Sequence, residues 1–129
     1  MNPINESGKG AEDRLEEFLI QNNIPYKRGG NVTIDFTIYT KDKIVYIDCT
    51  NQNVAGSVEE KVPHKIWKYQ KRIGFKEVII QRGKLELGKE VMEHIKDIEE
   101  SKDIKVLVWT EEEVRSYLLG LPPKQNPFF

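Results

Sequence analysis

The fold of this 129-residue chain is decided by one stretch, VTIDFTIYTKDKIVYIDCT, which covers residues 32–50. Apolar and polar residues alternate along both of its halves, and this period is typical of β-strands with one buried face. The polar residues Thr40 to Lys43 separate the halves and predict a hairpin turn. In the second strand, Ile44 to Thr50, the alternation places Val45, Ile47 and Cys49 on one face and Tyr46, Asp48 and Thr50 on the other.

Helices are predicted on both sides of the hairpin. Apolar residues recur at helical spacing from Ala11 to Asn22, and a second helix begins at Ser57, its expected N-cap. Gly74 is the expected C-terminal stop of the second helix. Pro63 lies past the first turn of that helix, so we expect either a bend there or a separate turn over residues 57–61.

The rest of the chain alternates between strand and helix patterns. In order, these are a strand over Glu77–Gln81, a helix through Leu87, Val91, Ile95 and Ile98, a strand over Ile104–Trp109 and a helix capped by Thr110 and Glu113. The predicted class is α/β, with a mixed sheet flanked by helices that is antiparallel at the hairpin and joined by helical crossovers afterwards. We divide the chain into a flexible lead-in over residues 1–10, a single domain over residues 11–120 and a tail over residues 121–129.

The charges are distributed unevenly along a chain whose net charge is only −1. Residues 61–84 hold eight Lys or Arg residues against one acid, whereas residues 85–113 hold ten acids against four lysines. A local excess of positive charge is what binding to a polyanion requires. Four of these cations recur at helical spacing and form either a nucleic-acid-binding stripe or the solvated face of a lysine-rich helix. They are Lys61, Lys65, Lys68 and Arg72.

The single cysteine, Cys49, excludes an intrachain disulfide and a cysteine-based zinc cluster. Its isolation agrees with a reducing compartment. The apolar runs are too short to cross a bilayer, and no signal peptide precedes the first helix. We therefore expect a cytoplasmic protein without membrane contact.

Two aspartates, Asp35 and Asp48, occupy adjacent strands of the predicted hairpin. Mg²⁺ prefers oxygen ligands, usually one or two carboxylates together with waters and substrate phosphate. The two carboxylates and the backbone carbonyl of Cys49 would therefore make a site for Mg²⁺, or for Mn²⁺. The alternative is that both aspartates merely face water.

The residues around these aspartates resemble the PD-(D/E)XK superfamily, which includes restriction-type nucleases and Holliday-junction resolvases. The segments Asp48-Cys49-Thr50-Asn51-Gln52 and Gly56-Ser57-Val58-Glu59-Glu60-Lys61-Val62-Pro63 look like Glu-Cys-Lys-x-Gln and Gly-Ser-x-x-Glu-Lys-x-Pro of small superfamily members. The resemblance covers residues 9 to 82, approximately. It implies a restriction-endonuclease-like αβββαβ core, to which this chain adds a C-terminal strand and helix.

The resemblance also implies roles for individual residues. Asp35 and Asp48 match the two acids that bind metal in the family. Glu12 looks like the helix glutamate that orients the attacking water, and Glu16, one turn further on, is an alternative. Gln52 matches a glutamine placed near the substrate or the water. Glu12 and Glu16 can also be ordinary solvated helix residues, and Gln52 can be an ordinary loop amide. Glu60 can equally be a capping residue.

Thr50 is the main departure from the family pattern, which has lysine at this position. That lysine polarises the scissile phosphate and lowers the pKa of the attacking water, and a threonine hydroxyl supplies no positive charge. Either a relocated lysine replaces it, with Lys61 or Lys65 as candidates, or the protein has lost hydrolysis and kept DNA binding.

The leading expectation is a Mg²⁺-dependent DNA endonuclease of restriction, homing or junction-resolving type, acting on duplex or branched DNA. The alternative is a catalytically degenerate DNA-binding or interaction module. Cutting both strands usually needs two active sites, so a homodimer or a higher homo-oligomer is expected. The tail, which includes Phe128 and Phe129, would be either disordered or docked on another surface.

Overall fold

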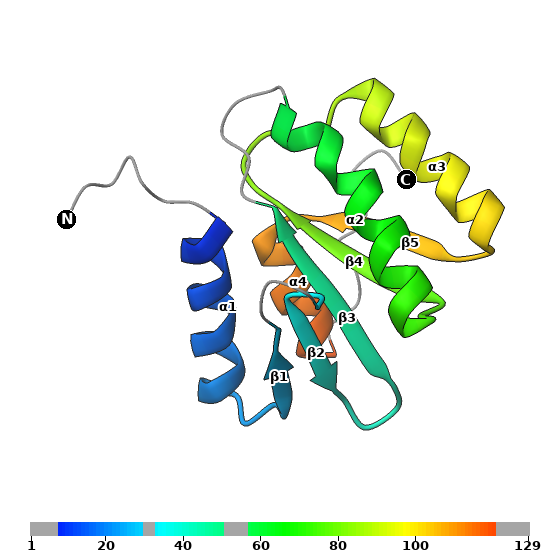
Figure 1. The fold of residues 1–129 in the computed structure, drawn as a ribbon. Helices are drawn as coiled ribbons and strands as arrows, with labels where there is room; N and C mark the ends of the chain where they lie inside the picture. The colour runs from blue at the N-terminus through cyan, green and yellow to red at the C-terminus, as the bar shows by residue number, and fades with distance from the viewer. Residues whose placement is uncertain (1–7, 30–32, 51–56, 121–129) are drawn as a thin grey trace, which may run out of the picture.

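The computed structural model describes residues 8–29, 33–50 and 57–120, whose arrangement is drawn in Figure 1. In chain order, the elements of this part are α1 (Gly8–Gln21), β1 (Tyr26–Arg28), β2 (Phe36–Tyr39), β3 (Ile44–Thr50), α2 (Ser57–Ile73), β4 (Glu77–Arg82), α3 (Lys89–Lys102), β5 (Lys105–Trp109) and α4 (Glu111–Leu118). The order from α1 to β4 is αβββαβ, which confirms the predicted core. β5 and α4 are the added C-terminal strand and helix.

The strands form one sheet in the order β1-β2-β3-β4-β5. β1, β2 and β3 are antiparallel neighbours, whereas β3, β4 and β5 are parallel because α2 and α3 cross over between them. The predicted mixed sheet is therefore confirmed. β3 lies at its centre, and the carboxyl ends of the three parallel strands meet at the same end of the sheet.

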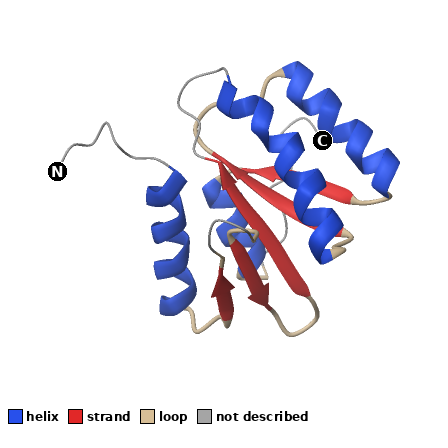
Figure 2. Cartoon of the chain, in the orientation of Figure 1, coloured by secondary structure: helices blue, strands red, loops and turns tan. Residues whose placement is uncertain are grey.

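Helices cover both faces of the sheet, as Figure 2 shows. The face under α2 and α3 has a core that includes Val62, Ile66, Val78, Ile80, Val91 and Ile95. The face under α1 and α4 has a core that includes Leu15, Leu19, Phe36, Ile47, Ile79 and Val114. The alternation predicted along β3 is confirmed, because Tyr46 packs in the first core and Val45, Ile47 and Cys49 pack in the second.

β2 begins later than its sequence pattern indicated. Asp35 was expected within this strand but lies immediately before it. Ile34 packs in the core under α2 and α3, whereas Phe36 packs in the opposite core. Residues i and i+2 of a regular strand share a face, so the backbone must depart from regular strand geometry at Asp35. Val32, where the pattern started, lies outside the described residues.

α2 is one continuous helix with Pro63 inside it. The separate turn expected over residues 57–61 is therefore wrong. Pro63 and its neighbours Val62 and Ile66 are buried, so packing against the sheet maintains the helix despite the hydrogen bond that a proline removes. A bend at Pro63 stays a prediction, and the side chain of Ser57, the expected cap, lies outside the described residues.

Two further expected helix ends are confirmed, whereas α1 begins at Gly8, before the expected Ala11, and α3 begins at Lys89, after Leu87. Gly74 ends α2 with φ +76°, a conformation that glycine adopts at little cost. At the start of α4, the Thr110 hydroxyl accepts a hydrogen bond from the N–H of Glu113 at 3.2 Å, and the Glu113 side chain accepts one from the N–H of Thr110. In the described ranges, no helix is both long and apolar enough to cross a membrane.

Candidate active site

Asp48 is a buried carboxylate near the carboxyl end of β3. The residue is only 2% exposed, and it lies on the face of the sheet that α2 covers. Neither of its carboxylate oxygens has a hydrogen-bond partner among the described residues. An ionised group buried in this way is costly unless an opposite charge accompanies it. The alternative that Asp48 merely faces water is therefore wrong.

Asp35 lies beside Asp48 across the β2–β3 ladder. Phe36 pairs with Ile47, and the same register extended by one residue places Asp35 opposite Asp48. Asp35 Oδ2 accepts a hydrogen bond from the backbone N–H of Cys49 at 2.8 Å. The N–H and C=O of one strand residue point to the same side, so the Cys49 carbonyl is directed to the side of β3 on which Asp35 lies.

The charge of Asp35 makes ionisation of Asp48 less favourable. Burial and then the charge of Asp35 raise the pKa of Asp48 well above its ordinary value. When both are ionised, they repel, and a cation between them is the partner that the geometry favours.

The ligand set suits a hard cation that keeps water in its coordination shell. Within the described ranges, no three His, Cys, Asp or Glu side chains are grouped closely enough to hold a metal ion. Two carboxylates and one carbonyl leave positions for water and phosphate, which Mg²⁺ accepts and a closed structural zinc site does not. The Cys49 side chain packs in the core under α1 and α4, on the opposite face of β3 from Asp48, and burial and then the charges of Asp35 and Asp48 raise the pKa of its thiol well above the ordinary value.

The structure distinguishes between the two candidate glutamates of α1. Burial, followed by the charge of Asp35, raises the pKa of Glu12, so Glu12 lies within range of the charge of Asp35. Glu16 instead accepts hydrogen bonds from the Tyr26 hydroxyl at 2.8 Å and from Arg28 at 3.0 Å. Glu12 is thus the glutamate near the site, and Glu16 is occupied by contacts with β1.

Lys65 is the residue of α2 whose positive charge acts on both Asp48 and Glu12. Burial dominates the raised pKa values of Asp48 and Glu12, and the charge of Lys65 lowers both. Lys65 is half-buried, whereas Lys61 is exposed. Thr50 is 6% exposed and shares the face of β3 with Asp48. Lys65 of α2 therefore supplies positive charge near the aspartates, whereas Thr50 of β3 supplies none.

The remaining predicted residues fall into two groups. Gln52 lies outside the described residues, as does the side chain of Glu60. Lys68 and Arg72 continue along α2 from Lys65, half-buried and exposed respectively. The role of each in binding or catalysis stays a prediction.

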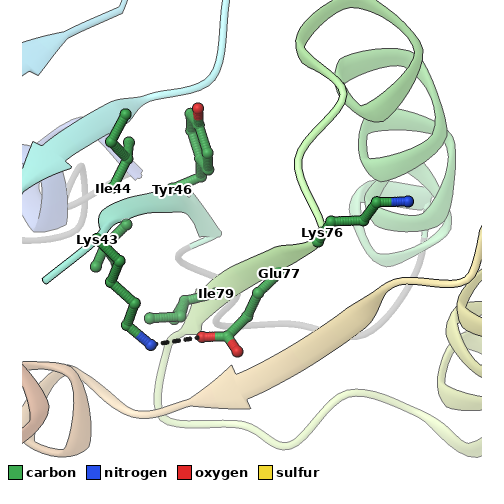
Figure 3. A pocket seen from close by; sticks show the side chains of 7 residues that line it. Lys43, Ile44, Tyr46, Lys76, Glu77 and Ile79 are labelled. Carbon is green, nitrogen blue, oxygen red and sulfur yellow. Dashed lines mark hydrogen bonds and ion pairs between the residues drawn. The ribbon is translucent and has the colours of Figure 1, made fainter.

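A small pocket of about 170 Å³ lies at the opposite end of the sheet, at the amino ends of β3 and β4. Figure 3 shows its lining, in which Lys43 Nζ and Glu77 Oε1 form an ion pair at 3.4 Å. Ile44, Tyr46 and Ile79 supply apolar contacts. None of the residues predicted for the site lines this pocket, so it is separate from the cluster around Asp48.

The matching family model is described as a PD-(D/E)XK nuclease superfamily domain, and it covers residues 5–110. The chain belongs to the PD-(D/E)XK nuclease superfamily. This result confirms the family resemblance and agrees with the restriction-endonuclease-like core formed by α1 to β4. Members of the superfamily generally use divalent metal ions. No curated protein and no solved structure matches the sequence.

Two residues near the superfamily site were not anticipated from the sequence. Arg28 of β1 forms ion pairs with α1, and Tyr69 of α2 is buried close to the aspartates. Burial and then the charges of Asp48 and Asp35 raise the pKa of Tyr69. Tyr69 packs in the core under α2 and α3, and Arg28 belongs to no motif, so no local signal pointed to either.

Proposed function

We propose that this protein is a metal-dependent DNA endonuclease whose site contains Asp35, Asp48 and Glu12. The observation that carries the proposal is the buried carboxylate of Asp48, whose oxygens have no hydrogen-bond partner in the described part of the chain. It lies beside a second carboxylate, in a chain of a nuclease superfamily. Such a pair is costly to maintain without a cation, which supports a metal site.

Asp35, Asp48 and the Cys49 carbonyl would hold the ion, with Mg²⁺ as the first candidate and Mn²⁺ as a substitute. When bound, a divalent ion supplies Lewis-acid stabilisation to the phosphate and lowers the pKa of water. The hydrogen bond from Cys49 N–H to Asp35 orients one ligand relative to the next. The protein's contribution is thus a rigid arrangement at the centre of the sheet.

The hydrolysis itself assigns separate tasks to Glu12 and Lys65. Glu12 would orient a water for in-line attack and accept its proton, since a carboxylate with a raised pKa is a better base. A P–O bond forms to this water as the P–O bond to the leaving oxygen breaks, and solvent supplies the proton for that oxygen. The Lys65 ammonium would stabilise charge on the phosphate oxygens, the task that Thr50 cannot perform.

Binding of DNA would use the basic stripe of α2, defined as Lys61, Lys65, Lys68 and Arg72. Lys61 and Arg72 are exposed, and Lys65 and Lys68 are half-buried, so positive charge lies along one flank of the helix. Within the stripe, Lys65 is the residue whose charge acts on Asp48 and Glu12. Phosphates along α2 would therefore place the scissile bond near Asp48.

The alternative function, a DNA-binding module without hydrolysis, is favoured by one observation. Thr50 stands where the family has a lysine, and Lys65 approaches from a different element. If Lys65 does not reach the phosphate, metal and DNA binding would persist without cleavage.

The experiment that tests the proposal measures binding and cleavage on the same samples. Labelled duplex and four-way-junction DNA are incubated with excess protein and Mn²⁺ or Mg²⁺, and Mn²⁺ binding is measured separately by calorimetry. We expect the wild-type chain to bind Mn²⁺ and cut DNA, and Asp35→Ala and Asp48→Asn to lose both. Asp97→Ala, on the exposed surface of α3, is the matched control and should keep both.

Each contrary result has a distinct meaning. Wild type that binds Mn²⁺ and DNA but cuts neither substrate supports the alternative function. Wild type that binds no Mn²⁺ overturns the proposed metal site. Cleavage that survives Asp48→Asn places the chemistry elsewhere in the chain.

A further inference from the structure

An arginine of β1 contacts three acids of α1. Arg28 Nη1 lies 2.9 Å from Asp13 Oδ1 and 3.0 Å from Glu16 Oε1, and Arg28 Nη2 lies 3.8 Å from Glu12 Oε1. The Tyr26 hydroxyl donates a further hydrogen bond to Glu16 at 2.8 Å. A planar guanidinium presents several N–H groups in a fixed fork, so one side chain can hold several carboxylates. β1 is thus joined to the part of α1 that carries Glu12.

The same part of β1 contacts the segment that carries Asp35. Arg28 pairs with Phe36 across the β1–β2 ladder, and its guanidinium lies 5.7 Å from the centre of the Phe36 ring. The N–H of Gly29 donates a hydrogen bond to the carbonyl of Asp35 at 2.8 Å. The dipeptide Arg28-Gly29 therefore contacts Glu12 through a side chain and Asp35 through the backbone.

Electrostatics explains why such a connection is needed. Glu12, Asp35 and Asp48 carry like charges, and Asp35 and Glu12 both raise the pKa of Asp48, after burial as the main cause. Repulsion among three carboxylates favours movement of α1 away from the sheet. Lys65 opposes part of this charge, but it belongs to α2, which covers the opposite face of the sheet from α1.

We propose that Arg28 is a positioning residue of the nuclease site, which keeps Glu12 beside Asp35 by binding the acids of α1. This inference rests on the proposed function, because it assigns Arg28 an effect on the water that Glu12 orients. Arg28 itself contacts neither the metal nor the reacting phosphate. Its ion pairs are partly exposed, with 59% of the Asp13 side chain accessible, so they add little to global stability. Their main consequence is the location of Glu12.

A double-mutant cycle tests this role. Single-turnover cleavage at saturating Mn²⁺ is compared for wild type, Arg28→Met, Glu12→Gln and the double variant. We expect Arg28→Met to slow cleavage about 10- to 100-fold, the usual effect of removing a group that orients an active-site residue. The double variant should be no slower than Glu12→Gln alone, because both substitutions remove the same contribution. Arg28→Lys should recover part of the rate.

Binding measurements separate positioning from metal binding and folding. Affinities for Mn²⁺ and for DNA should change little in Arg28→Met, whereas Asp48→Asn loses Mn²⁺ binding. Arg14→Met is the matched control, since Arg14 lies on α1 itself but pairs with Glu111 of α4 at 2.9 Å. It removes an arginine of similar exposure and should leave the cleavage rate near that of wild type.

Additive effects of Arg28→Met and Glu12→Gln would overturn the inference while leaving the proposed function intact. The same holds if Arg28→Met abolishes Mn²⁺ binding. Wild type that binds no Mn²⁺ overturns both. If the chain binds Mn²⁺ without cutting DNA, the position of Glu12 is measured by NMR instead. Bound Mn²⁺ broadens the signal of the Glu12 carboxyl carbon when the two are close. Broadening should be weaker in Arg28→Met than in wild type, and equal broadening overturns the inference.

Discussion

The backbone N–H of Cys49 donates a hydrogen bond to Asp35 Oδ2 at 2.8 Å, which connects the two candidate metal ligands. Asp48 precedes Cys49 in β3, so this bond sets the position of Asp35 relative to Asp48. It also satisfies a backbone donor in the interior of the sheet, beside a cysteine that is 5% exposed. The Asp35 carboxylate therefore both accepts a hydrogen bond that supports the sheet and serves as a candidate metal ligand.

Two substitutions of Asp35 should separate these tasks. Asp35→Asn keeps an acceptor for the Cys49 N–H but removes the charge, so the fold should persist while Mn²⁺ binding is lost. Asp35→Leu removes the acceptor as well and should lower the free energy of unfolding by a further 1–3 kcal/mol, approximately. Urea denaturation and Mn²⁺ calorimetry measure the two effects. Equal free energies of unfolding in the two variants would show that the hydrogen bond does not stabilise the fold.

Asp48 should make the metal-free protein less stable as pH rises. Burial and then the charge of Asp35 raise its pKa in the folded state, so folding opposes its ionisation. The stability associated with protonated Asp48 is complete below the ordinary pKa of 3.8 and is lost as pH rises through the raised value. At pH 7 in EDTA, Asp48→Asn should therefore be more stable than wild type, by at least about 1 kcal/mol.

Thermal unfolding in EDTA at pH 4 and pH 7 measures this difference, which should nearly disappear at the lower pH. Saturating Mn²⁺ should reverse the order, since only the wild type gains stability from the ion. A wild type that is more stable than Asp48→Asn at pH 7 in EDTA would contradict the description of Asp48 as an unsatisfied buried charge.

Lys65 should be replaceable by a lysine at the family position. Lys65→Ala is expected to slow cleavage about 100-fold at saturating Mn²⁺ because a charge near the phosphate is lost. Adding Thr50→Lys to this variant should restore part of the rate, since residue 50 shares the face of β3 with Asp48. Lys61→Ala, at an exposed position of the same helix, is the control. A larger loss in Lys61→Ala than in Lys65→Ala would reassign the role to Lys61.

The basic stripe of α2 should determine how DNA binding depends on salt. Each phosphate contact removed should reduce the slope of log affinity against log salt by about 0.9 for duplex DNA. Lys68→Ala and Arg72→Ala should weaken binding at 100 mM salt without regard to DNA sequence, whereas Lys96→Ala, on exposed α3, should not. Fluorescence anisotropy across a salt series measures the slope. An unchanged slope would remove α2 from the interface.

Gly29 should tolerate no side chain. A Cβ at this position would collide with the Ile34 carbonyl oxygen and Thr33 Oγ1, so the backbone before Asp35 would have to move. Gly29→Ala should lower the free energy of unfolding by about 1–3 kcal/mol and weaken Mn²⁺ binding. Gly120→Ala is a useful comparison, because no atom surrounds its Cβ position, although its φ of +77° adds backbone strain. Mn²⁺ binding that is unchanged in Gly29→Ala would show that Asp35 does not depend on this close approach.

Except for β1, which only the family resemblance implied, the strand and helix order was readable from the sequence, because it follows from local alternation and helical spacing. Val45, Ile47 and Cys49 were placed on one face of β3 by a period of two residues, and that period is a property of the backbone alone. The capping residues Thr110 and Glu113 lie three positions apart, so their contact was also predictable. The pairing of Asp35 with Asp48 followed from the hairpin and from the family motif.

Burial and electrostatics at the site required the tertiary structure. The covering of Asp48 by α2, the departure from regular strand geometry at Asp35 and the approach of Lys65 all depend on how distant elements pack. The same holds for Arg28, whose partners lie on α1, 12 to 16 positions earlier in the chain. The sequence by itself thus determined the order of elements and the two aspartates. Only the tertiary structure decided which charges meet, because that depends on three-dimensional distance and solvent exclusion and not on spacing along the chain.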